Sequence, residues 1–331
     1  MYATTKTAFI NVNRYTHKNQ QITPMKKITD IVKTGWIMVS DGALGTFLQA
    51  KGLQPGECPE LWNIEKPSEV LDVYQQYVDA GADMVQTNSF GGTSFKLKNY
   101  GLTHRVAELN RAAAAISRKA AGENRNVIAS VGPTGQILMM GEVSEMEMYN
   151  AFKEQIVALA EGGADTICIE TMSDLDEALL AVKAAKEHTH CEVICTMTFE
   201  KTVANEYRSM MGISPSEMTL ALTGAGVDIL GANCGNGAEN MIQIVQEIRS
   251  INKSIPVLVH ANAGLPKYID GKTVFPETPD ETAKFVSRLI EAGANIIGGC
   301  CGTTPEHILK ISEIVANYNF TLLSAKRVKS N

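Results

Sequence analysis

The sequence predicts an α/β protein folded as a single-domain (β/α)8 TIM barrel with a flexible N-terminal extension. Three observations support this fold class. The chain has 331 residues, which is long for an ordinary domain but normal for one α/β barrel. Short apolar segments alternate with helical patterns along most of the chain. Four passages also repeat one local pattern: VDAGADMVQTN, AEGGADTICIET, TGAGVDILGANC and EAGANIIGGCC.

Each repeated passage combines the end of a helix, a glycine and a short apolar run. Glycine commonly follows a helix because it accepts the left-handed backbone conformation without strain. The continuous apolar run is typical of a parallel strand that is covered on both faces. The passages therefore predict a repeating unit of helix, tight turn and buried strand.

Eight such units can be placed in order along the chain. The predicted strands cover 36–40, 83–87, 127–131, 165–169, 192–197, 228–232, 256–260 and 295–299. The predicted helices cover 67–80, 103–121, 144–161, 175–187, 215–224, 238–251, 279–292 and 304–316. A doubly wound open sheet is the alternative. We favour the barrel because polar motifs follow the C-terminal ends of the strands, where barrels build their sites.

The composition limits the classes of function. Hydrophobic residues make up 44% of the chain but aromatic residues only 6%, so we expect a large aliphatic core. The net charge of −6 gives no basic surface for nucleic acid or a membrane. No apolar run reaches membrane-spanning length. Seven cysteines without an export signal favour a reducing, cytoplasmic compartment.

The chain divides into three segments. Residues 1–24 are polar and lack periodicity, and we interpret them as a flexible extension, with Met25 as an alternative start. The barrel is expected over 25–320, and residues 321–331 are expected to form a C-terminal tail.

Three cysteines follow predicted strands: Cys234 after the sixth, and Cys300 and Cys301 after the eighth. The C-terminal ends of barrel strands share one face, so these thiols should converge. Adjacent cysteines pair poorly in a disulfide, and the Cys-X-X-Cys redox spacing is absent. Three buried small residues would be a simpler interpretation, but it fits equivalent strand ends poorly. We therefore expect zinc on three cysteine ligands, with an open fourth position and with nearby glycines giving the backbone freedom to turn.

A centre with three thiolates restricts the chemistry. Three anionic soft ligands overcompensate the charge of a dication and leave it a weak Lewis acid, which disfavours water activation. A substrate thiol is a better fourth ligand, because the metal deprotonates it and keeps it nucleophilic at neutral pH. The residues alone thus indicate an enzyme that alkylates a thiol.

Five motifs resemble the homocysteine S-methyltransferase family: SDGALGT, QTNSF, GANCGNG, HANAGLP and GGCCGTTPEHI. Within it, the chain is most similar to the homocysteine-binding module of cobalamin-dependent methionine synthases. The resemblance covers roughly residues 30–317. It implies a zinc-containing barrel that methylates homocysteine to methionine, with Cys234, Cys300 and Cys301 as the zinc ligands. The order of these cysteines is the most specific part of the match.

The same resemblance suggests the residues that hold the amino acid. Glu170 matches the acidic residue that receives the substrate ammonium group, and Asp41 and Gly42 match the segment that lines the pocket. A carboxylate is the natural partner for an ammonium group. Two alternatives remain open, because Glu170 is also suited to a helix N-terminus and Asp41 to capping a helix at 43–50.

Three asparagines also occupy motif positions, namely Asn88, Asn233 and Asn262, and we assign them to substrate binding. Asn88 and Asn262 have the alternative role of tying loops together. His260 ends the seventh strand, and we expect it to be hydrogen-bonded internally rather than bound to zinc. The long loop 264–280 suits a lid or docking surface, or else a variable surface insertion.

We therefore expect a zinc-dependent homocysteine S-methyltransferase. The sequence leaves no room for a cobalamin domain, so methylcobalamin would arrive on a separate corrinoid protein. One alternative keeps the fold but uses S-methylmethionine or betaine as the donor. Another is a methyltransferase that demethylates a small substrate onto a corrinoid protein. A non-catalytic zinc or amino-acid sensor is less compatible with an open metal position.

Overall fold

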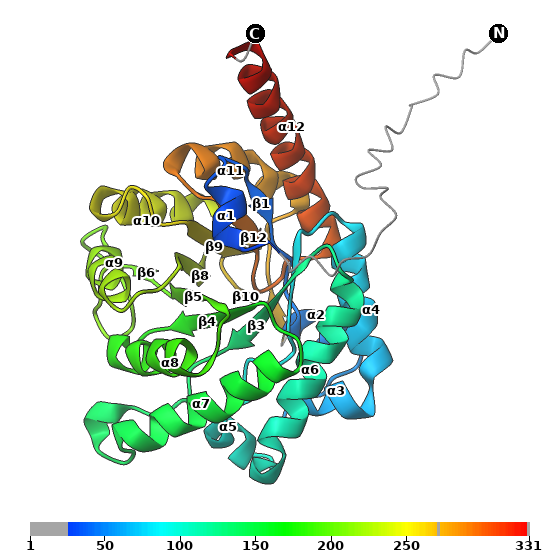
Figure 1. Ribbon diagram of the computed structural model, residues 1–331, viewed down its shortest axis with the longest axis vertical. Coiled ribbons are helices and arrows are strands. Elements are labelled where there is room, and N and C mark those ends of the chain that lie inside the picture. The colour runs from blue at the N-terminus through cyan, green and yellow to red at the C-terminus, as the bar shows by residue number, and fades with distance from the viewer. Residues whose placement is uncertain (1–25, 270–271, 330–331) are drawn as a thin grey trace, which may run out of the picture.

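The computed structural model describes residues 26–269 and 272–329. Parallel strands form a barrel at its centre, and helices surround them (Figure 1). The strands neighbour one another in the order β1-β12-β9-β8-β5-β4-β3-β2. Their bounds are β1 (Met38–Val39), β2 (Met84–Gln86), β3 (Asn126–Val131), β4 (Thr166–Met172), β5 (Glu192–Met197), β8 (Ile229–Gly237), β9 (Val257–Asn262) and β12 (Ile296–Gly299).

A seam between β1 and β2 closes the barrel. The Val39 backbone N–H donates to the Asp83 carboxylate at 2.9 Å, and the Asp83 backbone N–H donates to the Val39 carbonyl at 2.7 Å. Closer to the strand ends, the Gln86 backbone N–H donates to the Asp41 carboxylate at 2.7 Å. The predicted (β/α)8 barrel is thus confirmed over the doubly wound sheet.

The outer helices pack against one another in a row around the barrel, from α9 through α10, α11, α12, α4, α6 and α7 to α8. The main ones are α4 (Pro67–Asp79), α6 (Val106–Ala121), α7 (Glu145–Glu161), α8 (Leu175–His188), α9 (Pro215–Gly224), α10 (Ala238–Ile251), α11 (Pro279–Ala292) and α12 (Pro305–Lys329). Shorter helices are α1 (Ile28–Val32), α2 (Gly45–Ala50), α3 (Trp62–Glu65) and α5 (Ser94–Lys98), with 3-10 turns at Pro59–Leu61, Thr103–Arg105 and Leu138–Met140.

The repeated passages share a polar residue at the start of the strand. The sequence alone does not reveal its role, which is to accept a hydrogen bond from the neighbouring strand. Asp83, Asp165, Asp228 and Asn295 each accept a hydrogen bond from the backbone N–H of a neighbouring strand. Buried backbone donors need such partners where a ladder begins. The repeat therefore encodes both the helix stop and a link between adjacent strands.

Helix α1 closes the end of the barrel at which the strands begin. Its Ile28 and Val32 pack against one apolar residue from each of the eight strands: Met38, Met84, Ile128, Cys168, Ile194, Ile229, Leu258 and Ile296. The Glu192 carboxylate accepts from the backbone N–H groups of Ile28 at 2.6 Å and Thr29 at 3.1 Å, which satisfies the start of this helix. We call this apolar layer with α1 the barrel floor.

Most of the predicted elements agree with the structure to within a few residues. The last helix is longer than predicted, because α12 continues from 316 to Lys329 through the segment expected as a tail. Residues 306–329 contain neither glycine nor proline, so nothing local stops the helix. The predicted flexible extension at 1–24 lies outside the described residues. In the described ranges, the helices all lack the combination of length and apolar character that crossing a bilayer requires.

Candidate active site

The alternation of side chains along each strand places polar residues inside the barrel above the floor. On β4, Cys168 belongs to the floor, whereas Ile167 and Ile169 pack into the outer core. Glu170 is two residues beyond Cys168 and so shares its phase. The polar residues buried near the strand ends include Gln86, Ser130, Glu170, Thr196, Asn233 and His260. The interior therefore changes from apolar to polar toward the C-terminal ends of the strands, as in other barrels with sites there.

The three predicted cysteine ligands come together at this end. The Sγ atoms of Cys234, Cys300 and Cys301 all lie within 4.8 Å of one another, and those of Cys234 and Cys301 are 4.0 Å apart. Zinc–sulfur bonds of about 2.3 Å at tetrahedral angles would put two sulfurs about 3.8 Å apart. The three thiols therefore fit a zinc ion with only small movements.

The protonation of the three thiols is uneven. Cys300 and Cys301 donate toward the Cys234 sulfur, which lowers the pKa of Cys234 and raises the pKa of each donor. The Asn262 side chain and the Gly235 backbone also donate to Cys234 and lower its pKa further. A dication bound by the three sulfurs would stabilise their thiolate forms.

The turn that carries the adjacent cysteines depends on its glycines for two different reasons. Gly302 has φ +79°, and a Cβ atom there would lie 2.2 Å from Cβ of Phe275. At Gly299 the constraint is space alone, since a Cβ atom would lie 2.2 Å from Oγ1 of Thr303. The predicted need for backbone freedom therefore applies to Gly302, whereas Gly299 allows a close approach.

Thr303 fixes this turn to the first strand. Its hydroxyl donates to the Cys300 carbonyl at 2.7 Å and accepts from the Ala43 backbone N–H at 3.0 Å. The Tyr77 hydroxyl donates to the Ala43 carbonyl at 2.8 Å. A Cβ atom on Gly42 would lie 2.8 Å from both Thr303 and Tyr77. Gly42 therefore allows the segment after β1 to approach the cysteine turn.

Asp41 and Glu170 form a pair of buried carboxyl groups joined by Gln86. The Gln86 backbone donates to Asp41 at 2.7 Å, and its side-chain amide donates to Glu170 at 3.0 Å. The Ser130 hydroxyl also donates to Glu170. One residue of β2 thus holds both acids in place.

Both acids are suited to binding a cation. The pKa of Asp41 is raised to about 7: burial raises it most, the hydrogen bond from the Gln86 backbone lowers it, and the charge of Glu170 raises it. Burial also raises the pKa of Glu170. An ammonium group would stabilise the ionised forms of both acids, so this pair could receive the amino group of an amino acid.

The alternative roles of the two acids are wrong. Helix α2 begins after Leu44 with no side-chain cap, so Asp41 does not cap it. Helix α8 begins at Leu175 and is capped by Asp174, whereas Glu170 lies within β4. Glu170 faces the interior because it shares the strand phase of Cys168. Asp41 follows β1 and is held instead by the hydrogen bond from the Gln86 backbone N–H.

The asparagines occupy distinct positions. Asn88 donates to the Pro59 carbonyl at 2.7 Å and to the Asn63 side chain at 3.1 Å, as expected for tying loops together. Asn262 donates to Cys234, while its Oδ1 atom is buried without a partner among the described residues. Asn233 is 1% exposed and bonds to Thr171 and Thr196. Only Asn262 therefore has a buried acceptor left for a ligand.

His260 lies outside the cysteine cluster, as expected. It is 1% exposed, and its Nε2 atom has no hydrogen-bond partner within the described ranges. Burial lowers its pKa to about 4, so the imidazole is neutral at neutral pH.

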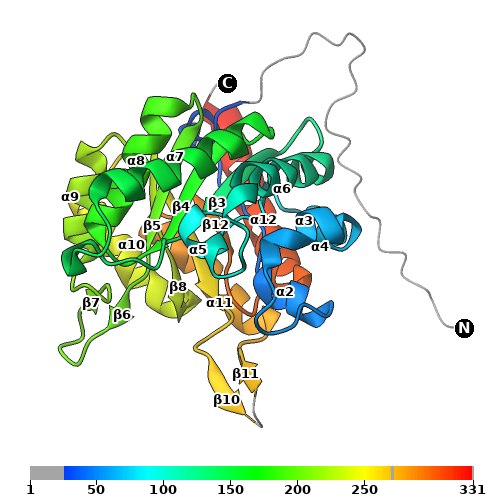
Figure 2. The same ribbon diagram turned by 90° about the horizontal axis from the view of Figure 1, so that it is seen from below.

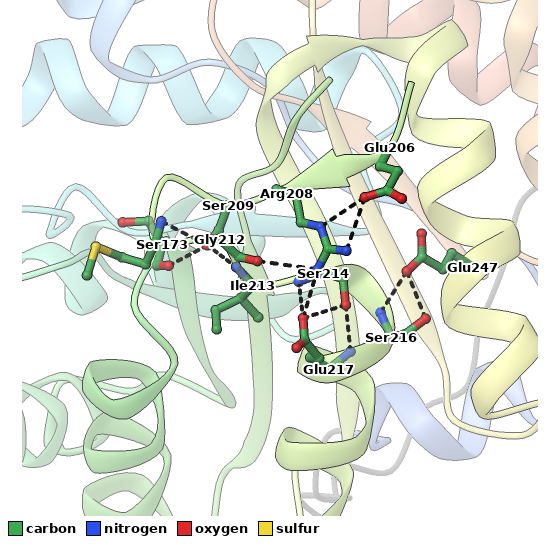
Figure 3. Close-up of polar contacts among 11 residues, drawn as sticks. Ser173, Glu206, Arg208, Ser209, Gly212, Ile213, Ser214, Ser216, Glu217 and Glu247 are labelled. Atoms are coloured by element: carbon green, nitrogen blue, oxygen red, sulfur yellow. Dashed lines mark hydrogen bonds and ion pairs between the residues drawn. The ribbon is translucent and has the colours of Figure 1, made fainter. Parts of the chain in front are cut away.

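A hairpin after β5 is fastened to the adjacent helix start (Figure 3). Its strands are β6 (Glu200–Lys201) and β7 (Tyr207–Arg208). Arg208 forms ion pairs of 3.1 Å with both Glu206 and Glu217. The Ser209 hydroxyl donates to the Ser173 carbonyl at 2.7 Å, which links this loop to the end of β4. These contacts hold one edge of the barrel mouth.

A second hairpin occupies the loop predicted as a lid or docking surface. Its strands are β10 (Lys267–Ile269) and β11 (Lys272–Val274), and it projects away from the barrel (Figure 2). Tyr268 is 79% exposed. The hairpin is anchored at its base, where Phe275 lies against Gly302 and the Glu277 backbone N–H donates to the Ala263 carbonyl at 3.0 Å. The loop therefore stands directly beside the cysteine turn.

Sequence reasoning missed Gln86, Ser130 and Thr303. A signal existed for the first two, since each is a polar residue at the end of an apolar strand and in phase with a floor residue. Thr303 lies in the quoted GGCCGTTPEHI motif, but threonine in a turn has many possible roles.

Comparisons with known proteins agree with this geometry. A family described as homocysteine S-methyltransferase matches residues 38–315. Methionine synthase of Mycobacterium tuberculosis (strain ATCC 25618 / H37Rv) is 34% identical over 302 residues, which cover 85% of this chain and 25% of that protein. Methionine synthase of Mycobacterium leprae (strain TN) is 32% identical over 311 residues, which cover 88% and 25%. The chain therefore spans about a quarter of the length of these relatives.

The fold also matches a solved structure. The homocysteine methyltransferase MmuM from Escherichia coli, in its metallated form, has a TM-score of 0.70 and 24% identity, covering 86% of this chain and 98% of that one. At this identity the likeness supports the fold. The family match over most of the chain and the mycobacterial relatives support the family itself. The chain belongs to the homocysteine S-methyltransferase family, and it is accordingly a methyltransferase.

Proposed function

We propose that this chain is a zinc-dependent homocysteine S-methyltransferase that forms methionine with a methyl group from a separate methylated corrinoid protein. The convergence of three thiols within 4.8 Å of one another, in the same barrel mouth as two buried acids, carries the proposal. The thiols select a sulfur atom and the acids select an ammonium group. Homocysteine has both groups in one small molecule.

The zinc ligands in this proposal are Cys234, Cys300 and Cys301. Zinc in this site would offer an open fourth position that favours the thiolate form of the homocysteine sulfur. Asp41 and Glu170 would bind the ammonium group, and Gln86 would keep them apart and aligned. Burial strengthens these charge interactions, because the surrounding dielectric is low.

The segment Asp41–Gly42 and the turn at Cys300 are held together by Thr303. This contact supports an amino-acid pocket beside the sulfur site, so that a single bound molecule would reach both. The protein would thereby orient the sulfur toward the mouth, where a donor enters. Such positioning accounts for much of the rate in transfer reactions that need little covalent help from the enzyme.

The donor assignment is supported by the resemblance to cobalamin-dependent methionine synthases and by the mycobacterial relatives, which are named methionine synthase. The projecting hairpin beside the cysteine turn, with its exposed Tyr268, would offer a contact surface to a donor protein. S-methylmethionine and betaine are the competing donors. An assay of methionine formation from homocysteine, with methylcobalamin, S-methylmethionine and betaine tested in parallel, distinguishes the three donors.

A metal analysis tests the site independently of the donor. We expect about one zinc per chain in the native protein and loss of zinc in Cys301→Ser. Cys191→Ser is the matched control, since Cys191 lies half-buried just before the start of β5, at the floor end of the barrel. Equal zinc retention by both variants would contradict the ligand assignment. Zinc without methionine formation from any of the three donors would contradict the proposed reaction.

A further inference from the structure

Two residues other than glycine have a left-handed backbone near the C-terminal ends of β4 and β8, the two strands that flank β5. Thr171 has φ +62° and Cys234 has φ +59°. The pairing of β4 with β5 shifts register between Ile169 and Met172, and the pairing of β8 with β9 shifts between Asn233 and Gly237. A β-branched residue such as threonine is an outlier in this region. Strain of this kind persists only where surrounding contacts impose it.

At Thr171 these contacts come from one side chain, Asn233. Its Oδ1 atom accepts from the Thr171 backbone N–H at 2.8 Å and from the Thr196 hydroxyl at 2.6 Å. Its Nδ2 atom donates to the Thr171 hydroxyl at 2.7 Å and lies 3.9 Å from the Cys300 sulfur, within reach of a hydrogen bond to sulfur. The two acceptor and two donor positions of the amide are all used.

Asn233 therefore has no hydrogen-bonding capacity left for a substrate. Its contacts instead connect the two halves of the site. One side of the amide fixes the peptide that directly follows Glu170, and the other side faces Cys300. Asn233 is also the residue before Cys234, so its backbone carries one proposed metal ligand and its amide contacts another.

We infer that Asn233 is a positioning residue that couples the metal site to the amino-acid pocket. It would hold the Glu170–Thr171 peptide in its left-handed conformation, so that the carboxylate faces the ammonium group, and would orient Cys300 toward the metal. This inference rests on the proposed function, and it reassigns Asn233 from substrate contact to alignment of two other groups. Outer hydrogen bonds of this kind commonly tune metal ligands.

Thr196 provides the matched control. Its hydroxyl donates to the same Oδ1 atom and it is fully buried, but among the described residues it forms no hydrogen bond with Glu170 or the cysteines. Thr196→Val keeps the shape of the side chain and removes one hydrogen bond. If Asn233 only linked the strands, removing its hydrogen bond to Thr196 would weaken the binding of zinc and of the amino acid much as truncating the Asn233 side chain does.

Two binding measurements on the full chain test the inference. The first is zinc affinity by chelator competition. The second is the affinity of the zinc-loaded protein for 2-aminobutyrate, which carries the ammonium and carboxylate groups but has no sulfur to contact the metal. For Asn233→Ala we expect both affinities to fall at least tenfold. For Thr196→Val we expect both to stay within threefold of the native values. Asn233→Ser is used in the same way if the alanine variant does not fold.

A rescue experiment separates the two halves of the role. Glycine adopts the left-handed conformation without strain, so Thr171→Gly combined with Asn233→Ala should recover part of the 2-aminobutyrate affinity. Zinc affinity should stay low in the double variant, because the contact to Cys300 is still missing. Recovery of 2-aminobutyrate affinity alone would support the inference.

Other results would overturn it. Native-like values for both affinities in the Asn233 variants would remove the positioning role. Equal losses in Thr196→Val would show that the amide only links strands. A native protein that binds neither zinc nor 2-aminobutyrate would instead contradict the proposed function, before any variant is compared.

Discussion

The ionisation of Asp41 should leave a measurable mark on stability. Its pKa is raised from 3.8 to about 7 by burial. Between these values the folded protein retains a proton that the unfolded chain has lost, so stability falls as the pH rises through this window. Asp41→Asn removes the titrating group while keeping an oxygen that can accept from the Gln86 backbone.

The size of the effect follows from the shift in pKa. A difference of about three pKa units corresponds to about 4 kcal/mol, and about 2.5 kcal/mol of this should be lost between pH 5 and pH 8. The stabilising contribution is fully present below pH 3.8 and is gone once the pH has passed about 7. A bound ammonium group would oppose the loss, since it stabilises the carboxylate.

Urea unfolding at several pH values between 5 and 8, without substrate, measures the effect. We expect the stability of the native protein relative to Asp41→Asn to decline by about 2.5 kcal/mol over this range. Changes in cysteine protonation affect both proteins and so cancel in the difference. Parallel pH profiles for the two proteins would refute the assignment of a raised pKa to Asp41.

The other predictions concern single substitutions. Glu170→Gln should weaken homocysteine binding about tenfold to a hundredfold, because a charged hydrogen bond is lost, while metal analysis should still find zinc; unchanged affinity would remove Glu170 from the pocket. Gln86→Leu keeps the backbone bond to Asp41 but should raise KM for homocysteine several-fold, and an unaltered KM would count against a linking role. Gly302→Ala should destabilise the fold by more than about 1 kcal/mol and reduce bound zinc, because of its positive φ and the contact with Phe275. Ser144→Ala should cost about 1 kcal/mol in thermal or urea unfolding by removing the cap of α7, with zinc content unaffected; a change in zinc would show that the distant cap influences the site.

The fold could be predicted because its signals are local and repeated. A glycine after a helix and a buried apolar run recur at nearly every strand. Helices α4 and α11 begin at Pro67 and Pro279, the residues at which the helices were predicted to begin. The end of α12 could not be predicted, because its last turns depend on contacts far along the chain. There Leu322 lies against Gly35, and Lys326 donates to the Thr34 carbonyl at 2.5 Å.

The candidate site was less evenly predictable. The cysteines stood out because two strand ends carried three copies of the same reactive group. Gln86 did not stand out. It holds Asp41 through its backbone N–H and Glu170 through its side-chain amide, and the directions of these two groups cannot be read from the sequence. Thr171 gave no signal at all, since its left-handed backbone is imposed by Asn233 from another strand.

The floor of the barrel determines from which side other modules can be attached. Helix α1 covers the strand starts, and α12 runs back to contact the segment just before β1. Both described ends therefore lie opposite the barrel end from which the hairpin β10–β11 projects, beside the cysteine turn (Figure 2). A donor protein fused to either end would begin on the wrong side of the barrel. Its tether would have to span the full height of the molecule before the effective concentration at the mouth could rise. Short fusions should therefore supply methyl groups no faster than the same donor added free in solution.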